Sequence, residues 1–127
     1  MRDILFRGKT VGGVWEYGVP VFSGLNNELA FMKQMHSYDH RVIPETVGQY
    51  TGLTDKNGKK IFEGDILDHT IQAEVLTNRG VVAWDCENAR WALQLNTMKP
   101  CFYMHNPKAV EVIGNIHDNP ELLEVQK

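Results

Sequence analysis

Three lysines, Lys56, Lys59 and Lys60, lie close together in a stretch framed by short apolar segments. Clustered ammonium groups can contact the phosphates of a nucleic acid, and aromatic side chains can stack on its bases. Lysines at a hairpin tip equally serve to keep strand edges soluble. The three lysines are the predicted nucleic-acid-binding residues, with further cations and aromatics for the same role at Arg2, Arg7, Lys9, Tyr50, Trp84, Trp91, Phe102 and Tyr103.

Asp65, Asp68 and His69 combine carboxylate and imidazole groups, which suit zinc or iron. On a strand, however, Asp65 and His69 share one face while Asp68 points to the other. We therefore expect turn capping by Asp65, solvent exposure for Asp68 and no metal site. His36 and His40 are four residues apart, but no glutamate completes a His-Glu-x-x-His motif, and we expect both to lie in a loop.

Other reactive residues also lack the spacing that catalysis requires. His105 and His117 each precede turn residues, and adjacent residues seldom give a histidine the geometry of a general base. Cys86 and Cys101 lack Cys-x-x-Cys spacing and are predicted to be structural or incidental thiols. Gly58 precedes two lysines without the upstream glycine of a phosphate-binding loop. We predict no catalytic, metal or cofactor-binding residue, and no enzymatic activity.

The composition is that of a soluble globular domain. The 127 residues are 43% hydrophobic and 23% charged, and the net charge of −3 argues mildly against a protein that binds duplex nucleic acid. The chain starts Met-Arg-Asp without an apolar leader, and no run approaches the roughly 18 apolar residues of a spanning helix. A cytoplasmic protein without membrane contact is predicted.

The elements around the lysines are marked by turn residues. Asn57 and Gly58 form the pair that most readily takes positive φ in a tight turn, so strands around Tyr50 and Ile61 should form a hairpin. A second turn at Glu63, Gly64 and Asp65 leads into another strand.

Upstream of this hairpin, Ile4 to Arg7 and Trp15 to Phe22 are predicted to form an N-terminal hairpin around Val11, Gly12 and Gly13. Its apolar face is predicted to hold Leu5, Trp15, Tyr17 and Val19. Residues 23–40 are ambiguous, because Leu25, Leu29 and Met32 have helical spacing; we favour a strand or an irregular arm.

Downstream, three short strands are predicted at Ala73 to Leu76, Gly80 to Trp84 and Arg90 to Leu95. Pro100 to Pro107 is predicted to be a long loop, and a last strand contains Val110, Val112 and Ile113. Asn119 is predicted to cap a short closing helix that begins with Pro120.

These elements predict a mainly β fold, a small antiparallel barrel-like or meander domain with an N-terminal hairpin and a short C-terminal helix. Residues 1–127 are predicted to form a single domain, in which an N-terminal lobe, 1–46, packs on a barrel-like part, 47–127.

Two longer runs carry a family resemblance: VGQYTGLTDKNGKKIFEGDIL, from Val47 to Leu67, and VEVIGNIHDNPELL, from Val110 to Leu123. Together with the opening RDILFRGK they closely resemble the YopX-like phage protein family. The resemblance implies a small, mostly β protein of a phage, prophage or mobile element, and it supplies no catalytic residues. The structural signature residues are Asn57, Gly58, Gly64, Asp65, Gly114 and Pro120.

The predicted function is a phage or prophage accessory protein in the cytoplasm of a bacterial host, acting as a non-enzymatic protein-interaction or assembly module. Its partner is another protein or a second copy in a homo-oligomer, and no cofactor is expected. The alternative is an accessory protein that binds single-stranded DNA or RNA. Strand-rich domains suit the first function because they readily pair edges and bury aromatic patches.

Overall fold

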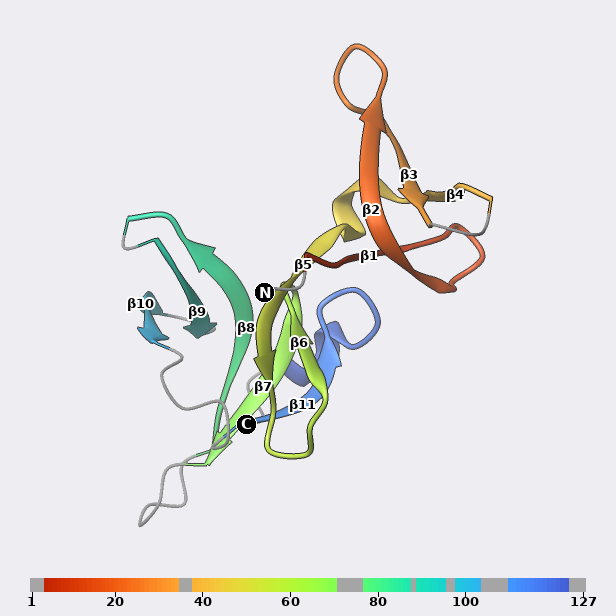
Figure 1. The fold of residues 1–127 in the computed structure, drawn as a ribbon. Coiled ribbons are helices and arrows are strands. Elements are labelled where there is room, and N and C mark those ends of the chain that lie inside the picture. Colours follow the sequence, from red (N-terminus) through yellow and green to blue (C-terminus); the bar gives the residue numbers. More distant parts are fainter. Residues whose placement is uncertain are drawn as a thin grey trace. The chain divides into compact units, whose positions relative to one another are not determined.

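The computed structural model describes residues 4–34, 38–70, 77–87, 89–95, 98–103 and 110–123 (Figure 1). The described part is built almost entirely of β-strands, in a six-stranded sheet of order β4-β3-β2-β1-β5-β6 and a five-stranded sheet of order β10-β9-β8-β7-β11. The chain divides into two compact units, Met1–Gly52 and Leu53–Lys127. The mainly β, antiparallel prediction is thus confirmed.

In the first unit, the first four strands form an antiparallel meander, and the fifth strand pairs with the first (Figure 1). Thr10 N donates to Val14 O and closes the predicted turn between the first two strands. Its strands are β1 (Phe6–Lys9), β2 (Trp15–Ser23), β3 (Leu29–Lys33), β4 (His40–Val42) and the start of β5 (Gly48–Thr54), with a 3₁₀ turn, η1, at Pro44–Thr46.

The ambiguous segment 23–40 contains strand β3 and no helix in its described part. Ala30 and Met32 are fully buried while Phe31 between them is only half-buried, which is the alternation of a strand. Leu25, part of the helical spacing, is fully exposed in a turn. The strand interpretation is therefore confirmed.

The core of the first unit lies on the opposite side of β2 from the predicted one. Ala30, Met32 and Val42 form the buried cluster, with Phe6 and Val47 packed against it. In β2, this side carries Gly18, which pairs with Phe6 of β1, and Pro20, which pairs with Met32 of β3. The prediction that Tyr17 and Val19 face the core was wrong, since they are 45% and 54% exposed.

Two glycines explain why the inner side of this sheet holds small residues. A Cβ atom on Gly8 would lie 2.8 Å from Val42 Cγ2, and one on Gly18 would lie 2.2 Å from the carbonyl oxygen of Lys33. Neighbouring strands and core side chains therefore approach the backbone so closely that no side chain fits.

The sheet of the first unit curls without closing into a barrel. Ile43 N donates to Lys9 O at 2.8 Å, so that the end of β4 meets the end of β1. The buried Thr46 hydroxyl reinforces this link by accepting from Lys9 N at 2.8 Å and donating to Ile43 O at 2.6 Å. These contacts are single bonds and not a strand ladder. The barrel-like prediction, which was made for residues 47–127, was also wrong there, because the five-stranded sheet is open, with β10 and β11 at its two edges.

The second unit holds the five-stranded sheet and the short strand β6 (Lys60–Phe62). Its core cluster consists of Ile61, Leu67, Val82, Leu93 and Val110, with Leu53, Trp91 and Val112 packed against it. The five strands are β7 (Asp65–Thr70), β8 (Thr77–Asp85), β9 (Arg90–Leu95), β10 (Met98–Tyr103) and β11 (Val110–Asn115).

The predicted strands Gly80 to Trp84 and Arg90 to Leu95 are present as parts of β8 and β9, whereas Ala73 to Leu76 lies outside the described residues. The predicted loop from Pro100 was wrong over its first part, because β10 runs to Tyr103 and pairs with β9. A register shift in this pairing and the position of β10 at the sheet edge accommodate Pro100. Residues 104–109 are not described.

The predicted C-terminal helix is only a 3₁₀ turn, η3, at Pro120–Leu123. Leu122 N donates to Asn119 O, which gives the tighter i to i+3 spacing. The Asn119 side chain is directed to Asn115 N instead of capping a helix. In the part of the chain that the structure describes, no helix is long and apolar enough to cross a membrane.

Candidate binding surface

A group of exposed apolar side chains in the first unit lies on the side of its sheet away from the Met32 core. We call this side the outer face. Strand alternation and pairing register place residues of β1 to β4 on it, because directly opposed residues of neighbouring strands point to the same side. They are Arg7, Lys9, Trp15, Tyr17, Val19, Val21, Ser23, Leu29, Phe31, Lys33 and Arg41.

The middle of the outer face is apolar and accessible. Tyr17, Val19 and Val21 are alternate residues of β2 and are 45%, 54% and 40% exposed. Phe31 of β3 lies directly opposite Val21 and is half-buried. Large apolar side chains that gather on one exposed sheet face are typical of an interaction site.

Cations surround this apolar centre. Arg7 is buried, and its guanidinium carbon lies 4.6 Å from the centroid of the Trp15 ring. Lys33 is opposite Val19, and Arg41 is opposite Phe31. Lys33 Nζ lies 3.8 Å from Asp39 Oδ2, with both side chains about half exposed, so solvent weakens that ion pair.

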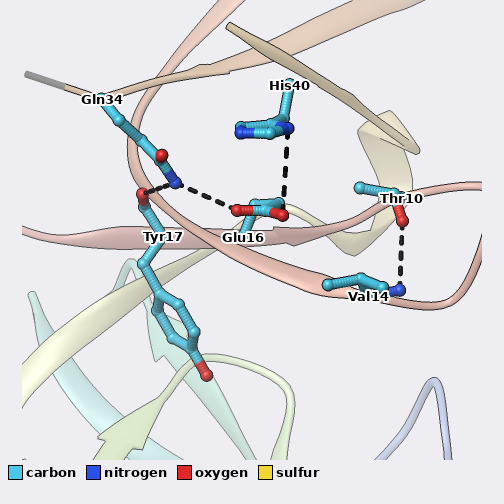
Figure 2. Close-up of polar contacts among 6 residues, drawn as sticks. All are labelled: Thr10, Val14, Glu16, Tyr17, Gln34 and His40. Atoms are coloured by element: carbon cyan, nitrogen blue, oxygen red, sulfur yellow. Dashed lines mark hydrogen bonds and ion pairs between the residues drawn. The ribbon is translucent and has the colours of Figure 1, made fainter. Parts of the chain in front are cut away.

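A polar cluster on the other side of β2 joins three strand segments (Figure 2). Gln34 Nε2 donates to Glu16 Oε2 and to Tyr17 O, both at 3.0 Å. His40 Nδ1 lies 3.9 Å from Glu16 Oε1, which is too long for the hydrogen bond of a carboxylate-oriented general base. Figure 2 shows the Tyr17 ring pointing away from this cluster, as alternation requires. The cluster links β2 to β4 structurally.

The structure brings the three sequence-predicted lysines together on the hairpin between β5 and β6. All three are exposed, but acidic groups accompany them: Lys56 Nζ lies 3.4 Å from Glu111 Oε2, and Lys59 is close enough to Asp55 to affect its titration. Their positive field is therefore partly neutralised. Of the predicted stacking residues, Tyr50 is buried, and the side chains of Phe102 and Tyr103 lie outside the described part.

Trp84, also predicted to stack on bases, is 47% exposed in the second unit. It lies directly opposite Trp91 across β8 and β9, and the two rings meet edge to face at a centroid distance of 5.1 Å. This pair shows a cross-strand aromatic contact that stabilises the sheet.

A family model described as "YopX protein" matches residues 22–124. The chain belongs to the YopX family. The crystal structure of protein EF1440 from Enterococcus faecalis resembles this YopX chain with a TM-score of 0.60 and 28% sequence identity, over 98% of this chain and 100% of the other. A comparison with curated proteins gave no match.

The two runs that carry the resemblance to the YopX family have structural roles in this chain. Asp55, which is 4% exposed, accepts hydrogen bonds from Asn57 N and Lys59 N at Oδ1 and from Val112 N at Oδ2. Burial alone would raise the pKa of Asp55, but these bonds and the Lys59 charge hold the pKa below its ordinary value. Asp55 thus fastens the hairpin to β11.

The hairpin turn differs from the predicted pair of positive-φ residues. Gly58 has φ of +79°, whereas Asn57 does not have positive φ. Gly58 N donates to Asp55 O and Asp55 N to Lys59 O, so the loop has three residues and ends in a left-handed glycine. The Asp55 carboxylate favours this turn because it accepts the Asn57 and Lys59 N–H groups.

The remaining signature residues build the other turns. Asp65 is buried and its Oδ2 accepts from Phe62 N across the turn that contains Gly64, at φ of +91°. A Cβ atom on Gly114 would lie 2.5 Å from Asn119 Oδ1, which accepts from Asn115 N. Pro120 begins the last 3₁₀ turn.

The described residues among the metal and histidine candidates do not gather into one site. Among the described residues, no group of three or more His, Cys, Asp and Glu side chains could hold a metal ion. Asp68 is half-buried, not exposed as predicted, because β7 is a central strand of its sheet. His117 N and Asp118 N donate to Asn115 Oδ1 in a turn, and Cys86 is exposed. His36, His105 and the side chains of His69 and Cys101 lie outside the described part.

Sequence reasoning missed the outer face because its residues come from four strands. The alternation in Trp15, Tyr17, Val19 and Val21 was visible, but alternate apolar residues ordinarily indicate the buried side of a strand. The signal that could have corrected this is the row of Gly18 and Pro20 between them, since such residues mark a close approach of backbones.

Proposed function

We propose that this YopX-family chain is a non-enzymatic binding or assembly module, an accessory protein of a phage or prophage, and that the outer face is its contact surface. The exposed row Tyr17, Val19 and Val21 carries the proposal. Leaving these side chains in water forgoes roughly 1 kcal/mol or more for each of them, by comparison with burial. Binding a partner recovers this free energy, whereas a catalytic site has no need of such a row.

A site-specific photo-crosslinker tests the placement of the contact surface. The photoreactive residue benzoylphenylalanine replaces Val19 in one variant and Val11 in a control. Val11 is a matched position because it is also apolar, belongs to the same unit and is 83% exposed in the turn between β1 and β2. The full chain is expressed in bacterial cells that carry the phage or prophage that encodes it, and the cells are then irradiated.

A discrete adduct from position 19 that is absent from position 11 supports the proposal. Its sensitivity to protease or to nuclease identifies the class of partner, and a doubled mass identifies self-assembly. Identical products from both positions, or none from either, contradict it. A second variant, Val19→Thr with Val21→Thr, keeps the β-branched shape and should abolish the native contact while leaving the circular dichroism spectrum unchanged.

A further inference from the structure

The cations of the first unit are concentrated on the outer face, although the unit as a whole is not basic. Residues 1–52 contain five Lys or Arg and five Asp or Glu residues, so their formal net charge is zero. Four of the five cations, Arg7, Lys9, Lys33 and Arg41, occupy strand positions of the outer face. The unit therefore has a positive side that its composition does not reveal.

Three of the four carboxylates that the structure describes in this unit lie away from the outer face. Glu16 points to the other side of β2, where Gln34 donates to it, and Glu28 accepts from Asn26 N in the turn between β2 and β3. Glu45 lies in η1, and Asp39 accompanies Lys33 just before β4. The described strand positions of the outer face carry no carboxylate. Two such faces would repel each other, which disfavours a second copy as the occupant.

Aromatic rings share the face with these cations. Tyr17 is the most exposed of them, and its ring points away from the polar cluster of β2. Phe31 lies between Val21 of β2 and Arg41 of β4 in the pairing register. A surface that joins cations for phosphates to aromatic rings for bases matches single-stranded nucleic acid, whose bases are free to stack on protein.

We propose that the outer face binds single-stranded nucleic acid, with Tyr17 and Phe31 stacking on bases and Lys9, Lys33 and Arg41 contacting phosphates. This inference rests on the proposed function, because it names the occupant of the same surface. It assigns the nucleic-acid site to the first unit instead of the lysine hairpin, because the outer face joins its cations to accessible aromatic rings. The ion pairs do not decide between the two surfaces, since Lys33–Asp39 and Lys56–Glu111 are about equally exposed. An acidic protein segment is the competing occupant.

The test measures fluorescence anisotropy of labelled oligonucleotides of about 12 nucleotides, since single-strand sites span about 4 to 16. The probes are oligothymidine DNA, oligouridine RNA and a DNA duplex of the same length, each at about 50 and 200 mM salt. The variants of the full chain are Lys33→Glu with Arg41→Glu, Tyr17→Ala and Tyr17→Phe. The control, Lys59→Glu with Lys60→Glu, makes the same change in net charge on the hairpin.

Single strands should bind more tightly than the duplex, and the DNA and RNA probes show which of the two is preferred. Tyr17→Ala should weaken binding by about 5- to 150-fold, the loss of one base stack, whereas Tyr17→Phe should keep the affinity. Reversal of Lys33 and Arg41 should reduce the slope of log K against log salt by about 1.4, from two lost phosphate contacts. The hairpin control should keep both affinity and slope.

Other results overturn the inference. Equal binding of single strands and duplex would show that stacking is not used, and equal loss in the two charge-reversal variants would exclude the outer face as the specific site. No binding up to about 100 µM protein at the lower salt would exclude nucleic acid. If a protease-sensitive adduct still forms from position 19, the proposed function stands with a protein partner; if neither binding nor adduct is seen, both proposals fail.

Discussion

Replacing Asp55 by asparagine should weaken a buried polar link in the second unit. Asp55 is 4% exposed and accepts three backbone hydrogen bonds of 2.8, 2.9 and 3.0 Å. In Asp55→Asn, the amide oxygen can keep the two hairpin bonds, but Nδ2 then faces the N–H group of Val112. A lost bond to a charged acceptor costs about 1.5 to 3 kcal/mol, and an N–H group without a partner about 1 to 3 kcal/mol.

Because these two costs overlap, the free energy of unfolding should fall by about 2 to 4 kcal/mol. Urea unfolding followed by tryptophan fluorescence measures it, since Trp84 and Trp91 lie in the same unit as Asp55. The matched control is Asp39→Asn, which makes the same chemical change at an exposed ion pair and should cost less than about 1 kcal/mol. Equal effects of the two substitutions would refute the role assigned to Asp55.

The pH dependence of the stability difference between the wild type and D55N gives a second check. The folded-state pKa of Asp55 lies below its ordinary value of 3.8. Its stabilisation is therefore complete above that value and is lost as the pH falls through the lower, folded pKa. The wild-type advantage over D55N should be constant near neutral pH and shrink below about pH 4. An advantage that stays the same down to the acid transition would show that the charge of Asp55 does not matter.

Two further substitutions test the packing of the first unit. Gly8→Ala should destabilise by about 1 to 3 kcal/mol in thermal unfolding, because its Cβ would lie 2.8 Å from Val42 Cγ2, while Gly12→Ala, whose Cβ meets nothing closer than 3.8 Å, should change little. Thr46→Val should lower the free energy of unfolding in urea by about 1 to 3 kcal/mol, because Lys9 N loses its acceptor. Thr46→Ser keeps the hydroxyl and should retain most of the stability. Equal losses in the two variants would contradict the hydrogen-bonding role.

Local sequence patterns predicted those elements whose turn and strand residues are neighbours in the chain. Arg90 to Leu95 was predicted with the bounds that β9 has, and the hairpin after β5 was placed correctly because Asp55 to Lys59 contains all its turn chemistry. The same locality made the three lysines easy to notice. Their acidic neighbour Glu111, however, comes from β11, and no local pattern indicates that contact.

Errors arose where contacts with another strand or with another residue of a turn, and not the residue types alone, decide the outcome. Pro100 and its neighbours read as a loop, but pairing with β9 and an edge position made them a strand. Asn119 was predicted to cap a helix, but its side-chain oxygen accepts a hydrogen bond from Asn115 N instead. The outer face was missed for the same reason, since β1, β3 and β4 bring Arg7, Lys33 and Arg41 to it only through the strand register.

The orientation of β2 bears on function because hydrophobicity alone favours the opposite one. A slip of one residue in its pairing would turn Tyr17, Val19 and Val21 inward and Gly18 outward. The observed register is determined by steric fit at Gly18. Only a glycine can lie against the carbonyl of Lys33, because a Cβ atom at this position would lie 2.2 Å from the carbonyl oxygen. A strand that is fixed by its small residues leaves its large residues exposed and available for contact. Stability by itself gives no reason for that arrangement, whereas binding through the outer face does.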